Sequence, residues 1–229
     1  MSRSSDIKLW VVVPAFNEAA TIDDVLADLR TIPCQTVVVD DGSTDNTAGK
    51  AVAAGATVLR HVVNLGQGAA LQTGIDYALQ EGASHIGTLD ADGQHAAKSV
   101  MTLLEKLRES NSDIAVGSRA LGTSVGMPRS RSMVIKAAVW FTRLHSGLPI
   151  TDTHNGLRVM TRCAAEKIRI HQPRMAHASE IMSQIREHSL RFVEAPVTIT
   201  YTEYSMRKGQ SVLGALKILL DLFYARWSK

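Results

Sequence analysis

The sequence predicts an α/β domain in which helices cover both faces of a mostly parallel central sheet. Short, continuously apolar segments alternate with longer segments whose apolar residues recur at helical spacing. The short segments are rich in β-branched residues, as is typical of strands buried on both faces. Polar loops follow these strands, so we expect ligands at the carboxyl ends of the strands.

Five strands and four helices are expected to alternate in the first half of the chain. The strands are expected at residues 9–13, 35–39, 57–60, 85–89 and 113–117. The helices are expected at residues 18–30, 44–54, 68–81 and 99–108.

The alternation changes beyond Arg119. Helices are expected at residues 133–144 and 176–187, a strand at 157–161, and one long strand or a strand pair at 191–202. Because no linker or internal repeat separates the two halves, we expect a single domain.

The composition is that of a folded chain large enough to bury a full core. Its 229 residues are 45% hydrophobic and 21% charged, which excludes disordered and low-complexity classes. The net charge of +3 is too small to indicate a nucleic-acid partner, and none is expected.

Cysteine content and hydropathy favour a protein of the cytoplasm. Cys34 and Cys163 are the only cysteines, which excludes a disulfide framework and a four-thiolate zinc site. The apolar stretch near the N-terminus is shorter than a signal-peptide core, so export is not expected. Charged residues interrupt the apolar segment 211–227, which is also shorter than a membrane span, so no transmembrane helix is expected.

The loop after the first strand reads Pro14, Ala15, Phe16, Asn17 and Glu18. A rigid proline followed by a short polar pair can present backbone groups to a base or a ribose. The alternative is a helix N-terminus, in which Asn17 caps the helix and Glu18 lies at the positive end of its dipole.

Two adjacent carboxylates, Asp40 and Asp41, end the second strand. They repel each other unless one accepts hydrogen bonds, which a base N–H and ribose hydroxyls would supply. The alternative is a capped turn with Ser43 or Thr44 as the N-cap, and Asp45 is expected in that turn in either case.

Gly66 and Gly68 begin the third helix, where backbone amides and the helix dipole can face a phosphate. The segment lacks the pattern of a P-loop and of a complete dinucleotide fingerprint. The alternative is a tight turn with close packing of the helix.

The fourth strand ends at Asp90 and Asp92, two carboxylates two residues apart. Such oxygen ligands suit Mg²⁺ or Mn²⁺ that bridges a substrate diphosphate. The alternative is a turn in which Asp92 caps the next helix, but it leaves Asp90 at a buried strand end without a partner. The position of His95 near the start of the next helix suits a metal ligand and a surface residue equally well.

Taken in order, the segments VVVPAFNEA, VVVDDGSTDNT, NLGQGAAL and LDADGQH resemble the donor half of inverting GT-A glycosyltransferases of family 2. They are most similar to the dolichyl- and polyprenyl-phosphate sugar synthases of that family. The resemblance is strong over residues 9–119 and traceable to about residue 211. It implies a GT-A fold with a Rossmann-like nucleotide-binding half, in a single domain at 1–210 whose acceptor half covers about 120–210, followed by an apolar or amphipathic helix at 211–229.

The resemblance also implies roles for individual residues. The nucleoside-binding residues would be Pro14, Phe16, Asn17, Glu18 and Asp41. The metal-binding residues would be Asp90, Asp92 and Gln94. Arg119 would hold the phosphates. Gln67 stands where these synthases usually carry Lys or Arg, which puts a direct charge contact from that loop in doubt.

Arginines and an aspartate provide the acceptor-side candidates. Arg129 and Arg131 precede a predicted helix, and paired guanidinium groups suit a phosphate, although solvated surface charge explains them equally well. The resemblance favours Arg131 as the residue that contacts a lipid phosphate. Asp152 would orient the acceptor or act as a base, or it would only cap a turn.

Two further groups of residues belong to the acceptor half. His177 and Glu180 lie one helical turn apart and suit a base dyad, although a local salt bridge or cap is the commoner arrangement. Segment 204–211 resembles a basic loop of the family, in which Arg207 and Lys208 would close over the diphosphate.

The apolar segment 212–227 carries too much apolar surface for a freely solvated helix. It would pack on the core, insert into a membrane interface or bind a small membrane protein.

The sequence therefore predicts a metal-dependent inverting glycosyltransferase. It would move a sugar from a UDP- or GDP-sugar to a polyprenyl phosphate, in the cytoplasm or at the inner face of the membrane. The expected catalytic residues are Asp92, Arg119, Arg131 and Asp152. One alternative is transfer to a sugar hydroxyl of a lipid-linked glycan.

Two alternatives come from other classes. A sugar-1-phosphate nucleotidyltransferase would be expected to carry a glycine-rich signature that is absent here. A non-catalytic nucleotide-sugar-binding protein could dispense with metal ligands, and the presence of Asp90 and Asp92 argues against it.

Overall fold

The computed structural model describes residues 7–127, 129–152, 155–172 and 176–201. The strands are β1 (Leu9–Ala15), β2 (Gln35–Asp40), β3 (Thr57–Arg60), β4 (His85–Thr88), β5 (Ile114–Val125), β6 (Arg158–Thr161) and β7 (Phe192–Thr200). The helices are α1 (Ile22–Leu29), α2 (Thr47–Ala53), α3 (Gln67–Gln80), α4 (Lys98–Glu109), α5 (Arg129–Ser146), α6 (Arg162–Lys167) and α7 (His177–Glu187).

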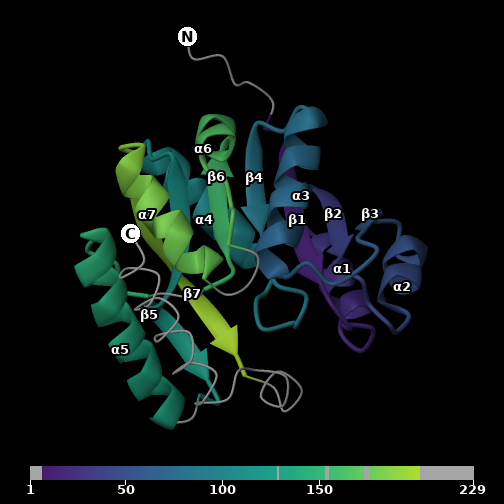
Figure 1. The fold of residues 1–229 in the computed structure, drawn as a ribbon, viewed down its shortest axis with the longest axis horizontal. Coiled ribbons are helices and arrows are strands. Elements are labelled where there is room, and N and C mark those ends of the chain that lie inside the picture. Colours follow the sequence, from purple (N-terminus) through teal and green to yellow (C-terminus); the bar gives the residue numbers. More distant parts are fainter. Residues whose placement is uncertain (1–6, 128, 153–154, 173–175, 202–229) are drawn as a thin grey trace.

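The seven strands form one sheet in the order β3-β2-β1-β4-β6-β5-β7 (Figure 1). β1 pairs in parallel with β2 and β4, β2 with β3, and β5 with β7. β6 runs antiparallel between β4 and β5. The predicted mostly parallel α/β sheet is confirmed, and the carboxyl ends of β1, β2, β3 and β4 meet at one edge.

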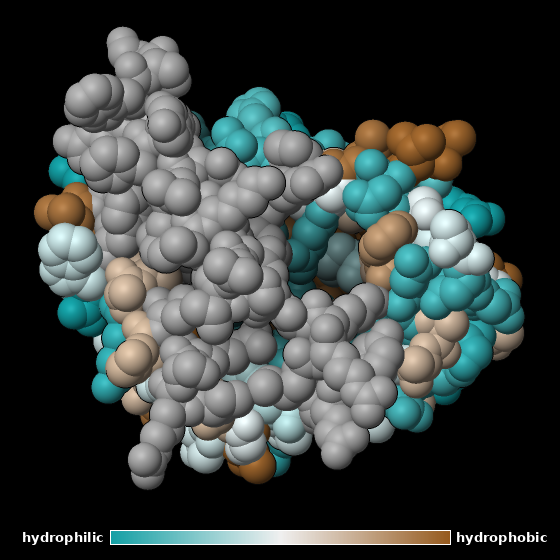
Figure 2. Space-filling model, turned by 60° about the horizontal axis from the view of Figure 1, so that its bottom comes forward, coloured by the Kyte–Doolittle hydropathy of each residue, from teal (hydrophilic) through white to brown (hydrophobic). Residues whose placement is uncertain are grey.

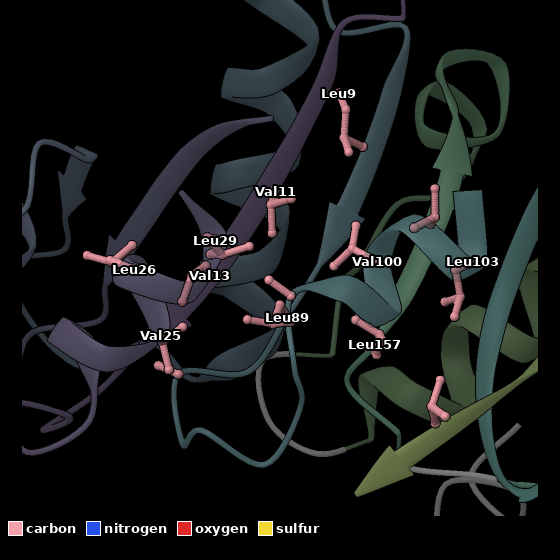
Figure 3. Close-up of a cluster of buried hydrophobic side chains, with 14 of the residues drawn as sticks. Leu9, Val11, Val13, Val25, Leu26, Leu29, Leu89, Val100, Leu103 and Leu157 are labelled. Carbon is pink, nitrogen blue, oxygen red and sulfur yellow. The ribbon is translucent and has the colours of Figure 1, made fainter. Parts of the chain in front are cut away.

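Helices cover both faces of the sheet. Successive side chains of a strand point to opposite faces, so a continuously apolar strand presents apolar side chains to a core on each side. Leu9, Val11 and Val13 of β1 pack in one core with the apolar faces of α1 and α4 (Figure 3). Trp10 and Val12 lie in the other core, with α3, α6 and α7. The helices packed on each face therefore exclude water from the central strands.

Several element boundaries differ from the prediction. β5 extends through Arg119 to Val125, because its second half pairs with β7 after an irregularity between Ser118 and Thr123. Residues 192–200 form one long strand, which confirms one of the two alternatives expected there, whereas the short helix α6 was not expected. Long-range strand pairing decides the end of β5, and local patterning does not reveal it.

Two boundaries near the N-terminus also differ. β1 does not stop before Pro14 but continues to Ala15, and Pro14 is in register with Val39 of β2. α1 begins at Ile22 rather than near Glu18, because Asn17 bonds to the loop after β2 and Glu18 to Thr47 at the start of α2. In the described ranges no helix has both the length and the apolar character needed to cross a membrane.

Candidate active site

The four donor motifs lie in loops at one edge of the sheet. β1 leads into residues 16–18, β2 into 41–46, β3 into 61–66 and β4 into 89–95. Figure 2, turned to bring this edge forward, shows a hollow with hydrophilic residues along its walls. The parallel sheet therefore brings together segments that are far apart in the sequence.

Hydrogen bonds connect the loop after β1 to the loop after β2. The Asn17 N–H donates to Ser43 Oγ at 2.9 Å, and Asn17 Oδ1 accepts from the Thr44 N–H at 2.8 Å. The Glu18 N–H donates to Thr47 Oγ1 at 2.8 Å. Asn17 has a left-handed φ of 54°, which asparagine adopts more readily than most residues. It thus shapes the junction of two loops instead of capping α1.

The predicted nucleoside-binding residues differ in exposure. Phe16 exposes 39% of its surface, Glu18 is 9% exposed, and Pro14 is buried within β1. Phe16 is therefore the side chain of this group with the most surface available to a base. The binding roles of all three remain predictions.

Asp41 at the end of β2 is buried, and protein groups already bond to its carboxylate. It accepts hydrogen bonds from the Leu65 and Gly66 N–H groups at 2.9 and 2.7 Å, and it lies 2.7 Å from His61 Nδ1. These donors relieve the repulsion between Asp41 and its buried neighbour Asp40. The carboxylate positions the loop before α3, and its nucleoside role remains a prediction.

Gly66 and Gly68 have packing roles at the start of α3. Gly66 has a φ of 98°, and its N–H donates to Asp41. A Cβ added at Gly68 would overlap the carbonyl oxygen of Gln172. The turn-and-packing alternative accounts for both glycines, so their contact with a substrate phosphate remains a prediction.

Asp90 follows β4 and faces several charged and polar groups. Gln67 Nε2 donates to Asp90 Oδ1 at 2.8 Å, and a Cβ at Gly156 would overlap the Asp90 carboxylate. Burial raises the pKa of Asp90, the nearby Arg158 opposes that rise, and Glu18 adds to it. The negative charge of Asp90 is therefore only partly compensated by the protein.

The loop after Asp90 is connected to the far side of the sheet. Asp92 Oδ1 accepts from the Gln94 N–H at 3.0 Å and closes a local turn, but the N-cap of α4 is Ala97, so Asp92 does not cap the next helix. The Gln94 carbonyl accepts from the Thr200 N–H, also at 3.0 Å. Asp92 thus lies in a loop that the end of β7 holds in place.

Asp90, Asp92 and Gln94 suit a divalent cation. Their carboxylate and amide oxygens are the hard donors that Mg²⁺ and Mn²⁺ prefer, and the undercompensated charge of Asp90 favours a cation. Within the described residues, no three His, Cys, Asp or Glu side chains are grouped to hold a metal. An ion at these residues would therefore need further oxygen ligands from an amide, substrate or water.

Arg119 and Asp152 form a buried ion pair at the other side of the site. The backbone N–H and Nε of Arg119 donate to Asp152 Oδ2 at 2.8 and 2.7 Å. Arg119 Nη1 donates to the Tyr201 hydroxyl at 2.8 Å. Glu194 in turn accepts from the Thr151 and Asp152 N–H groups. Asp152 therefore positions an arginine, and Tyr201 joins the site without any signal in the sequence.

His95 and Arg158 lie buried between these two groups. His95 is 6% exposed and Arg158 2%. Among the described residues, His95 Nδ1 and the Nε and Nη1 of Arg158 have no hydrogen-bond partner. Burial, with a smaller contribution from the Arg119 charge, lowers the pKa of His95 to about 4. The burial of Arg158 beside Asp90 was not predicted.

The buried neutral His95 should make folding sensitive to acid. The unfolded chain binds a proton at His95 below about pH 6.5, whereas the folded state does so only near pH 4. Stability from this residue is therefore complete above pH 6.5 and falls as the pH drops toward 4, by roughly 2 to 3 kcal/mol at pH 4.5. Denaturant unfolding with chelator present, at pH 7 and 4.5, measures this loss.

His95→Asn is the control for this prediction. It removes the titrating ring, so between the two pH values its unfolding free energy should fall by roughly 2 to 3 kcal/mol less than that of the wild type. Equal losses in both proteins would contradict the prediction.

Glu180 is engaged in local structure. Its carboxylate accepts from the His171 N–H at 3.1 Å and from the Gln172 N–H at 2.9 Å. His177 is 3% exposed at the start of α7. These bonds connect Glu180 to the segment before α7 and do not cap that helix, and the base dyad with His177 remains a prediction.

Several predicted residues cannot be placed in this site. Arg129 and Arg131 begin α5, but their side chains lie outside the part of the chain that the structure describes. Arg207, Lys208 and the predicted helix at 211–229 also lie outside it.

Comparison with known proteins identifies the family. The model of glycosyl transferase family 2 matches residues 10–169, well over half of the chain. The chain belongs to this family. The resemblance noted in the sequence is confirmed, and the protein is a glycosyltransferase.

Individual family 2 members are similar over nearly the whole chain. An uncharacterized protein of Methanocaldococcus jannaschii is 38% identical, with 94% of this chain and 90% of the relative covered. The UDP-N-acetylglucosamine–dolichyl-phosphate N-acetylglucosaminyltransferase of Methanococcus voltae is 27% identical, with 98% of both chains covered.

A solved structure confirms the fold. Glucosyl-3-phosphoglycerate synthase of Mycobacterium tuberculosis, in complex with Mn²⁺, UDP and phosphoglyceric acid, superposes with a TM-score of 0.71. The two proteins share 19% identity, over 94% of this chain and 78% of the other. At this identity the likeness supports the GT-A fold alone.

Proposed function

We propose that this family 2 glycosyltransferase moves a sugar from a nucleoside-diphosphate sugar, UDP- or GDP-linked, to a polyprenyl phosphate at a membrane surface. The donor would bind in the half of the domain at about 9–119, and the acceptor in the half at about 120–210. The relative from Methanococcus voltae is named for transfer to dolichyl phosphate, which supports this acceptor class.

The observation that carries the proposal is a pocket between β5 and α5. Its volume is about 360 Å³, and Arg119 and Asp152 lie at its wall together with the apolar side chains Met127, Val139 and Trp140. A polyprenyl phosphate combines an anionic head with an apolar chain, and this lining offers a partner for each part. A free sugar acceptor would leave the apolar walls without a matching group.

The donor side suits a sugar diphosphate with a divalent cation. Asp90, Asp92 and Gln94 would hold Mg²⁺ or Mn²⁺, which neutralises charge on a leaving diphosphate. The structurally similar glucosyl-3-phosphoglycerate synthase was solved with Mn²⁺ and UDP, which supports this assignment. Phe16 offers an exposed ring to the base.

The transfer needs a nucleophile and a leaving group in line at the anomeric carbon. An acceptor phosphate oxygen forms the new bond to this carbon, and the bond to the donor diphosphate oxygen breaks. The electron pair of that bond leaves with the nucleoside diphosphate, and the configuration at the carbon is inverted. Arg119 would bind the phosphate charge and align it.

The proposed acceptor requires no general base. A phosphate monoester with a second pKa near 6 is largely dianionic at pH 7, whereas a sugar hydroxyl needs a group to take its proton. Asp152 already accepts two hydrogen bonds from Arg119, so its carboxylate is suited to positioning the arginine. This arrangement favours a phosphate acceptor.

A comparison of acceptors tests the proposal. The full chain is first screened against UDP- and GDP-sugars with Mn²⁺ for thermal stabilisation, which identifies the donor. Short-chain polyprenyl phosphate should then yield a lipid-linked sugar and free nucleoside diphosphate, whereas the matched polyprenol should yield neither. Transfer to sugar acceptors with none to polyprenyl phosphate would overturn the proposal.

A further inference from the structure

Tyr201 lies at the point where the described chain leaves the sheet. It follows the last residue of β7, and its N–H donates to the Val125 carbonyl at the end of β5 at 3.0 Å. The residue is only 8% exposed, so its ring is held in the core between the two strands. A buried tyrosine hydroxyl needs a hydrogen-bond partner, and here that partner is a charged side chain.

The hydroxyl of Tyr201 accepts from Arg119 Nη1 at 2.8 Å. Arg119 is bonded at its other edge, where Nε and the backbone N–H donate to Asp152. A guanidinium group bonded at Nε alone can still change its side-chain torsions. The second bond, at Nη1, fixes the plane of the group as well as its position.

The same strand end also contacts the donor side. Thr200 donates its N–H to the Gln94 carbonyl, in the loop that carries Asp92. Thr200, the last residue of β7, thus bonds to the donor loop, and Tyr201, the residue after it, bonds to Arg119. The end of β7 and the residue after it therefore set the spacing between the Asp92 loop and Arg119.

We propose that Tyr201 is a positioning residue for the acceptor. Its hydroxyl holds Arg119 at the wall of the pocket between β5 and α5, so that the guanidinium plane faces an incoming phosphate. The inference rests on the proposed function, because it takes the acceptor of this pocket to be a polyprenyl phosphate. Tyr201 itself contacts no substrate in this account and acts through Arg119.

Tyr201→Phe removes only the oxygen and retains the buried ring. With the identified donor at saturation, the KM for short-chain polyprenyl phosphate should rise about tenfold, because a hydrogen bond to a charged group is lost. The kcat should stay within about twofold, since the bound phosphate still meets the arginine. Tyr77→Phe is the matched control, because Tyr77 lies beside Trp10 in the core and bonds to no site residue in any described contact.

A double-mutant cycle with Arg119→Lys separates positioning from a structural role. Lysine keeps the charge opposite Asp152 but lacks the planar group that reaches both partners. In this background Tyr201→Phe should change the KM by less than twofold. If the effects of the two substitutions on the free energy derived from the KM simply add, Tyr201 does not act through Arg119. That result would overturn the inference.

A second measurement keeps the inference testable if polyprenyl phosphate is not a substrate. The ¹⁵N NMR signals of the Arg119 side chain report rotation of its guanidinium group, and Arg119→Lys identifies them. Tyr201→Phe should speed this rotation, whereas Tyr77→Phe should leave it unchanged. Absence of transfer by the wild type would contradict the proposed function alone, whereas an unchanged Arg119 signal in Tyr201→Phe would overturn the role of Tyr201.

Discussion

Replacing Asp92 with Ala should abolish sugar transfer while the fold survives. If the cation at Asp90 and Asp92 neutralises the leaving diphosphate, loss of one carboxylate removes several kcal/mol of transition-state stabilisation. A loss of about 4 kcal/mol corresponds to roughly a thousandfold lower rate. The rate of transfer in the presence of Mn²⁺, together with the melting temperature, measures both parts of the prediction.

Asp24→Asn is the matched control for this substitution. Asp24 is an exposed carboxylate in the first turn of α1 that was not expected to bind the metal, and its replacement should change the rate less than twofold. Binding of Mn²⁺ to the wild type, followed by calorimetry, should be lost in Asp92→Ala and retained in Asp24→Asn. Wild-type turnover by Asp92→Ala in excess chelator would refute the metal assignment.

Replacing Arg119 should have the second largest effect, and it should fall on the acceptor. Arg119→Ala removes a charge from the pocket wall and breaks the ion pair with the buried Asp152, so we expect a hundredfold to thousandfold loss of kcat/KM for polyprenyl phosphate. Arg119→Lys keeps the ion pair and should lose about tenfold. Rates at saturating donor, with circular dichroism to confirm folding, measure these losses.

The same assay distinguishes charge positioning from base catalysis. Glu180→Gln should retain at least half of the wild-type rate, because Glu180 accepts hydrogen bonds from the 171–172 backbone. The rate of Asp152→Asn should lie between those of Glu180→Gln and Arg131→Ala, because the substitution weakens the contacts that hold Arg119. Arg131→Ala should be more damaging than either carboxylate variant. Near-complete loss in Glu180→Gln or Asp152→Asn with an active Arg131→Ala enzyme would favour a hydroxyl acceptor.

The central fold was predictable because its signals are local. Val37, Val38 and Val39 form a continuous apolar run that suits only a strand buried on both faces, and Ile22, Val25, Leu26 and Leu29 recur at helical spacing on α1. Strands joined by crossover helices usually run parallel, as β1 to β4 do, and the four donor loops therefore meet at one edge. The order and chemistry of their residues were then sufficient to indicate family 2.

The roles of individual site residues were less predictable, because they depend on which groups meet across the fold. Asp41 was expected to bind a nucleoside, yet the backbone after β3 supplies donors to its carboxylate. Gly68 suits a phosphate loop in the sequence, but the carbonyl of Gln172 fills the space beside it. Both partners are invisible to a reading of local motifs.

The amino-acid sequence by itself determined the parallel α/β sheet, the family and the oxygen-rich loop at Asp90 and Asp92, because periodicity and short motifs are encoded within a few neighbouring residues. Only the tertiary structure decided that Asp152 pairs with Arg119 and that Tyr201 completes this group. The three residues come from β5, from the loop before β6 and from the end of β7. Contacts over such separations arise from strand order and register, which local propensity does not specify.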